Sequence, residues 1–161
     1  MSKRAAALAD RIEQGAVQLA SYVEKLSDKD WRTTIGPRDG RTIGVIVHHV
    51  ASVYPIEVDL AKTLASGKPI AGVTWDAVHE INAKHAKEKV NVTKAEALDF
   101  LKKNSQTAAT AVRALSDAEL DRAATVSLNF DAPLTCQYFI EEHALRHSFH
   151  HLARMRAALG R

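Results

Sequence analysis

The sequence has few of the features that mark disulfide-rich or membrane-spanning proteins. Cysteine occurs once in 161 residues, at Cys136. A single cysteine excludes an intramolecular disulfide and a cysteine-rich zinc site, and it fits a reducing compartment. No segment approaches the roughly 20 apolar residues of a membrane span, and residues 1–10 lack the apolar core of a secretion signal. We therefore expect a cytoplasmic protein with no membrane contact.

The sequence also lacks a strongly basic segment. It has 22 Lys and Arg residues against 19 Asp and Glu residues, a net charge of +3, and these residues are scattered. Without a basic run that carries interleaved aromatic residues, we expect no nucleic-acid partner. A glycine-rich phosphate loop and an alternation of strands and helices are missing as well. The length suits one domain, which we assign to residues 1–161.

What the sequence does have is helical spacing of apolar residues almost throughout. The predicted long helices cover residues 3–26, 43–66, 94–115 and 134–159. The predicted connections contain a short turn at 27–31, a loop at 35–40, short helices at 75–85 and 117–120, and a brief extended segment within 123–133. This pattern predicts an all-α fold, a four-helix bundle with short extra helices in the connections.

Local signals set several of the predicted helix boundaries. Thr42 is the expected N-cap of the second long helix, which should bend at Pro55 and end at Gly67. The spacings of Thr93 with Glu96 and of Ser116 with Glu119 are those of capping boxes, each of which predicts a helix start.

Histidine is concentrated in the last predicted helix, at His143, His147, His150 and His151. His147 and His151 are one turn apart and share a stripe with apolar residues, so their imidazoles can bind one metal ion. His143 extends that face by one turn and could replace His151 as the partner of His147. The spacing alone leaves both pairings open, with His150 on the flank of this face; the family resemblance described below implies His147 and His151.

A third metal ligand is predicted at His49, on the core-facing side of the second long helix. His48 lies about 100° away around the same helix and replaces His49 if the register differs by one residue. Three protein ligands leave a coordination position open, as in catalytic metal sites, whereas structural zinc normally has four protein ligands. Imidazole ligands suit several divalent metals, of which we expect zinc or nickel.

Other polar residues have weaker signals, and we assign no catalytic residue. Glu57 lies two turns beyond His49 and is a candidate base or supporting carboxylate, although a solvated surface position is the simpler interpretation. Cys136 is expected to be a packing residue, and His79 and His85 are expected at the surface or its boundary. The alternative to an enzyme is a bundle that uses its metal or histidines for stability or binding without turnover.

Two segments resemble the DinB/YfiT-like superfamily, and the resemblance spans the whole chain. They are Arg-Thr-Ile-Gly-Val-Ile-Val-His-His-Val-Ala at residues 41–51 and His-Ser-Phe-His-His-Leu-Ala-Arg-Met-Arg at residues 147–156. Members bind a divalent metal inside a four-helix bundle, through a histidine in the second helix and an H-x-x-x-H pair in the last, often as homodimers. The resemblance implies the ligands His49 (or His48), His147 and His151, and a homodimer.

The resemblance says less about the reaction. Members include thiol-dependent transferases, maleylpyruvate isomerases that use a low-molecular-weight thiol, and many proteins of no assigned activity. It implies a metal-dependent hydrolase or thiol transferase for a small electrophilic substrate, with a low-molecular-weight thiol as a candidate second substrate. Thiol-transferase relatives often have Asp-Ser-His where this chain has Ser52-Val53-Tyr54. The missing histidine weakens the case for thiol transfer, although Tyr54 offers a phenolic donor.

Overall fold

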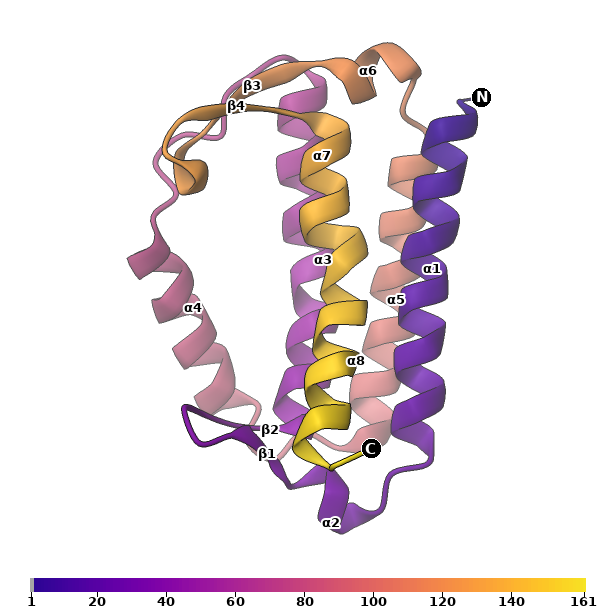
Figure 1. The fold of residues 1–161 in the computed structure, drawn as a ribbon, viewed down its shortest axis with the longest axis vertical. Helices are drawn as coiled ribbons and strands as arrows, with labels where there is room; N and C mark the ends of the chain where they lie inside the picture. Colours follow the sequence, from indigo (N-terminus) through magenta and orange to yellow (C-terminus); the bar gives the residue numbers. More distant parts are fainter. Residues whose placement is uncertain (1) are drawn as a thin grey trace.

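The computed structural model describes residues 2–161, and four long helical segments surround one core (Figure 1). These segments are α1 (Lys3–Glu24), α3 (Ile43–Ala65), α5 (Lys94–Arg113) and a C-terminal segment composed of α7 (Cys136–Ile140), a π-helical turn (Glu141–Leu145) and α8 (Arg146–Ala158). Helix α5 packs against α1 and α3, and the C-terminal segment packs against the same two helices. The predicted all-α four-helix bundle is confirmed.

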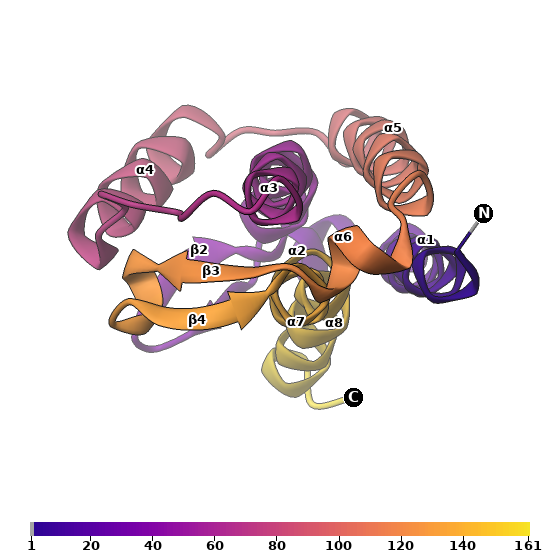
Figure 2. The ribbon, with the colours of Figure 1, turned by 90° about the horizontal axis from the view of Figure 1, so that it is seen from above.

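The connections hold the short elements. They are α2 (Asp28–Trp31), β1 (Thr34–Gly36), β2 (Asp39–Thr42), α4 (Trp75–Glu88), α6 (Asp117–Asp121), β3 (Ala123–Val126), a 3-10 turn (Ser127–Asn129) and β4 (Ala132–Thr135). The strands form two antiparallel hairpins, β1–β2 and β3–β4. Figure 1 shows the two hairpins at opposite ends of the bundle, and Figure 2 shows that α4 stands to one side of α3.

Two predicted boundaries are wrong for the same reason, which is cross-strand pairing. The expected loop at 35–40 belongs to the hairpin β1–β2, in which Thr34 pairs with Thr42. The last helix begins at Cys136 rather than at residue 134 because Leu134 pairs with Ala124 in the other hairpin. The extended segment expected within 123–133 is confirmed and continues to Thr135.

Side-chain caps define most helix starts. The hydroxyls of Ser2, Thr42, Thr74, Thr93 and Thr135 each accept a hydrogen bond from a backbone N–H in the first turn of the helix that follows. Ser116 and Glu119 form the predicted capping box. At Thr93 only half of the predicted box forms, because the Glu96 carboxylate lies 3.3 Å from the ammonium group of Lys89 instead. A cap contributes about 1 kcal/mol to helix stability, so these residues fix the ends of the bundle helices.

Helix α3 is the most apolar element of the bundle. By length and composition alone it could span a membrane, which corrects the expectation that no segment approaches such a length. However, 67% of its apolar window is buried inside the bundle. Its composition therefore reflects contact with other helices, as in the core helix of a bundle.

The helix α3 continues through Pro55 without a break. Proline has no N–H, so the carbonyl of Ala51, four residues earlier, loses its partner within the helix. The side-chain amide of the buried Asn104 on α5 donates to that carbonyl at 2.9 Å. A proline within this helix is thus tolerated because the neighbouring helix supplies the missing donor.

Candidate metal centre

Helices α3 and α8 bring three of the predicted histidines together. His49 comes from α3, and His147 and His151 lie one turn apart on α8. One ligand nitrogen from each of the three lies within 4.8 Å of the others. The ring centroids are 5.2 Å apart for His49 and His147, 5.5 Å for His49 and His151, and 4.9 Å for His147 and His151. We call these residues the histidine triad.

These separations match those of a shared metal ion. Two imidazole nitrogens bound tetrahedrally at about 2.0 Å from one zinc ion lie roughly 3.3 Å apart, with ring centroids roughly 5 Å apart. In the protein, Nε2 of His49 and Nε2 of His147 are 3.2 Å apart. In addition, Nδ1 of the buried His151 has no hydrogen-bond partner among the described residues. The donor set therefore fits one divalent ion with little rearrangement.

Burial keeps His49 and His151 in the neutral form that binds metal. Desolvation, with smaller contributions from the positive charges of His147 and Arg41, lowers the pKa of His49 to about 3. Desolvation and the two other triad histidines also lower the pKa of His151. Because a protonated imidazole cannot bind a metal, both residues are ready to act as ligands at neutral pH.

Glu57 holds the third imidazole in place. Its carboxylate Oε1 lies 2.7 Å from Nδ1 of His147, and its side chain is buried rather than solvated. A carboxylate on Nδ1 favours the tautomer whose Nε2 is free to face a metal. The solvated-surface interpretation of Glu57 is therefore wrong. The useful sequence signal was its position eight residues after His49, about two turns along the same face of the helix.

His48, the alternative to His49, lies outside the triad and contacts a histidine of α4. Its Nδ1 lies 2.8 Å from Nε2 of His85, and its ring packs 4.9 Å from the ring of Phe100. Desolvation and the charge of Lys89 lower the pKa of His48 to about 4. The geometry thus selects His49 over His48 as the neighbour of His147.

The remaining histidines of the last helix lie outside the triad. The π-helical turn interrupts the register between His143 and His147, and His143 packs on Phe139 with ring centroids 4.2 Å apart. His150 is exposed beside His151. Sequence periodicity gave no sign of the π-helical turn, a feature that often occurs at functional sites.

Other candidate groups are structural. Tyr54 is fully buried, and its hydroxyl is paired with the hydroxyl of Ser148 at 2.7 Å, so it is no free donor for the site. Desolvation raises the pKa of the buried Cys136 thiol to about 11, which agrees with a packing role. His79 is exposed and His85 is half-buried beside His48, so both lie at the surface or its boundary as expected.

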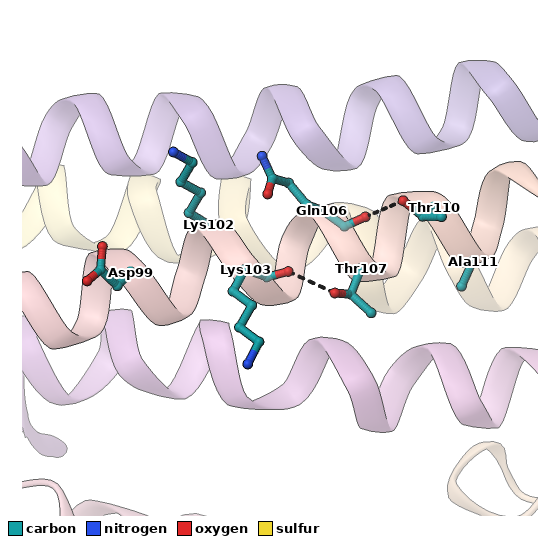
Figure 3. A pocket seen from close by; sticks show the side chains of 7 residues that line it. All are labelled: Asp99, Lys102, Lys103, Gln106, Thr107, Thr110 and Ala111. Carbon is teal, nitrogen blue, oxygen red and sulfur yellow. Dashed lines mark hydrogen bonds between the residues drawn. The ribbon is translucent and has the colours of Figure 1, made fainter.

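A depression on the exposed face of α5 lies apart from the triad (Figure 3). It is lined by Lys102, Lys103, Gln106, Thr107 and Thr110 among others. The two threonine hydroxyls donate to carbonyls of their own helix, at 3.0 Å and 2.8 Å. Because these hydroxyls are already paired and the face is open, we assign no function to it.

A family model for the DinB superfamily matches residues 4–155. The chain belongs to this superfamily. Among curated proteins, none matches the sequence. Among solved structures, the chain is similar to YfiT from Bacillus subtilis, with a TM-score of 0.78, 19% identity, and coverage of 99% of this chain and 90% of YfiT. YfiT is described as "a probable metal-dependent hydrolase with an unusual four-helix bundle topology". At this identity the likeness establishes a shared fold.

Proposed function

We propose that His49, His147 and His151 bind one divalent metal ion, zinc or nickel, and that the protein is a metal-dependent hydrolase of a small electrophilic substrate. The observation that carries the proposal is the triad itself, three buried or half-buried imidazoles at metal-sharing distances. The metal dependence named for YfiT and the DinB membership support it.

The residues of the chain have distinct tasks in this proposal. Glu57 accepts a hydrogen bond from Nδ1 of His147 and so directs Nε2 of that residue toward His49. The pairing of Tyr54 with Ser148 joins α3 to α8 beside His147, which holds the two halves of the triad in register. Three protein ligands leave a coordination position for substrate or water. When bound, the metal lowers the pKa of a water or thiol in that position and polarises an electrophile.

We prefer hydrolysis to thiol transfer because the side chain at position 54 has no unpaired polar group to offer the site. Tyr54 stands where thiol-transferase relatives often carry a histidine, and its hydroxyl is already paired in the core. Low-molecular-weight thiols nevertheless belong in the assay as a second substrate. That the protein is a cytoplasmic homodimer stays a prediction, and its mass in solution at micromolar concentration tests the dimer.

Metal content is the first test. Purified protein should contain about one divalent metal ion per chain by elemental analysis. The variants His147→Ala and His151→Ala should lose it, whereas His150→Ala, on the exposed side of α8, should retain it. Glu57→Gln should weaken metal affinity by about 10–100-fold, because the carboxylate orients His147. Full metal retention in both triad variants would refute the assignment.

Turnover is a separate test. Metal-loaded and metal-free protein would be assayed with small esters, amides and other electrophiles, with and without low-molecular-weight thiols. Metal-dependent hydrolysis without thiol supports the proposal. Turnover that requires a thiol would mean that the protein is a thiol transferase and not a hydrolase. Metal binding without turnover of any of these substrates would favour a non-catalytic metal-binding bundle.

A further inference from the structure

A fourth histidine, His85, lies beside the histidine triad and comes from a different element. It is located near the end of α4, the helix that stands to one side of α3 (Figure 2). Its ring centroid is 5.8 Å from that of His49, compared with 5.2 Å and 5.5 Å for the two triad partners of His49. His85 is therefore only slightly farther from His49 than the two triad partners of His49 are. It lies outside the set of ligand nitrogens within 4.8 Å of one another, so it must shift to join them.

The two ring nitrogens of His85 have different environments. Nε2 lies 2.8 Å from Nδ1 of His48. Nδ1 is buried and has no hydrogen-bond partner among the described residues. An unpaired buried polar atom costs roughly 1–3 kcal/mol, so such atoms are uncommon unless a partner is missing. The unpaired Nδ1 of His85 is therefore a candidate metal-binding atom.

The bond to His48 also prepares the correct tautomer. If Nδ1 of His85 is to bind a metal, the ring proton must be on Nε2 and needs an acceptor. Nδ1 of His48 lies at hydrogen-bond distance and accepts this proton in the tautomer that carries the His48 proton on Nε2. This pairing resembles the way that Glu57 supports His147, since metal-bound histidines generally donate their other N–H to a neighbouring group.

Helix α4 can move without disturbing the core. None of its residues is buried. Near its first turn the Trp75 indole N–H donates to the carbonyl of Leu128 at 3.2 Å, and near its end His85 pairs with His48. Elements with few buried contacts open and shift at low free-energy cost. A small displacement of the His85 end of α4 therefore leaves the four long helices intact.

We propose that His85 is a fourth, displaceable metal ligand, whose Nδ1 enters the open coordination position when no substrate is bound and leaves when substrate arrives. This inference rests on the proposed metal-binding function of the triad. It gives the site two states: a closed state with four imidazoles, as in structural zinc sites, and an open state with three. Helix α4 then links substrate binding to a change in coordination.

Nitrogen NMR of the zinc-loaded, ¹⁵N-labelled full-length chain tests the proposal directly. Long-range proton–nitrogen spectra distinguish metal-bound imidazole nitrogens from free ones. We expect four zinc-bound imidazoles in the wild type and three in His85→Ala. The matched control is His79→Ala, an exposed histidine on the same helix, which should keep four. Loss of His85 should also weaken zinc affinity by about tenfold or more.

The possible results separate this inference from the proposed function. If zinc shifts the nitrogens of the triad but leaves His85 unchanged in the wild-type protein, the fourth-ligand proposal is wrong and the triad assignment stands. If zinc shifts none of the triad nitrogens, the proposed function itself fails, and the inference falls with it. The wild-type spectra decide both points, so the outcome does not depend on how the variants fold.

Discussion

Replacing Asn104 with leucine tests how the bundle accommodates Pro55. In the protein, the Asn104 amide supplies the hydrogen bond that the carbonyl of Ala51 lacks because Pro55 has no N–H. Leucine has a similar size but no donor. Asn104→Leu should therefore leave a buried backbone carbonyl without a partner while creating little new cavity.

The expected cost follows from the hydrogen bond and its setting. A typical intramolecular hydrogen bond contributes about 1 kcal/mol, and leaving a buried partner unsatisfied costs about 1–3 kcal/mol. We expect Asn104→Leu to lower the free energy of unfolding by about 2 kcal/mol. For a chain of this size, that corresponds to a decrease of about 4–8 °C in Tm.

A double-mutant cycle isolates the cause. In a Pro55→Ala background the helix regains its own N–H for Ala51, so Asn104→Leu should cost at least about 1 kcal/mol less than in the wild type. Urea unfolding followed by circular dichroism gives the four free energies, with the exposed Gln106→Leu as a control on α5. Equal costs of Asn104→Leu in both backgrounds would show that the amide does not compensate for the proline.

Two further perturbations test the packing and the electrostatics. A Cβ at Gly44 would lie 2.6 Å from the Trp31 ring, so Gly44→Ala should destabilise the fold by about 1–3 kcal/mol. The control Gly40→Ala, whose Cβ would meet no atom within 4 Å, should change stability little. Equal midpoints of the two variants in thermal unfolding would contradict this reasoning. Hydrogen bonds from Arg41 lower the pKa of Asp39, so its stabilisation is present above the unfolded-state pKa near 4 and is lost as the pH falls below it. The Tm difference between wild type and Asp39→Asn should shrink between pH 5 and 3, and a constant difference would refute the ion-pair explanation.

The long helices were predictable because each has a continuous apolar stripe and a side-chain cap. Thr42 caps α3 as expected, and the stripe resumes in phase after Pro55. The hairpin β1–β2 was missed because its strands are three and four residues long and mostly polar, so their pairing has no periodic signal. The π-helical turn was missed for a related reason, since one extra residue in a turn changes the register without changing the composition.

The candidate site was only partly visible in the sequence. The i, i+4 spacing of His147 and His151 specifies a shared face, and the apolar neighbours of His49 specify an inward direction. The role of Glu57 depends on the relative height of α3 and α8, which no pattern within one helix encodes. The position of His85 likewise depends on where α4 packs beside α3. The apolar pattern of a short helix with no buried residues does not predict that position.

The contacts between α3 and α8 also explain why a site of polar residues can exist within the core. His49, Tyr54 and Glu57 of α3 meet His147 or Ser148 of α8, so each of these three side chains on α3 has a partner on α8. Each bond fixes the same register between the two helices. Removing one imidazole therefore deletes a ligand but leaves the remaining bonds and the surrounding apolar core in place. Loss of metal from His151→Ala should accordingly occur without unfolding, which circular dichroism on the metal-free variant would verify.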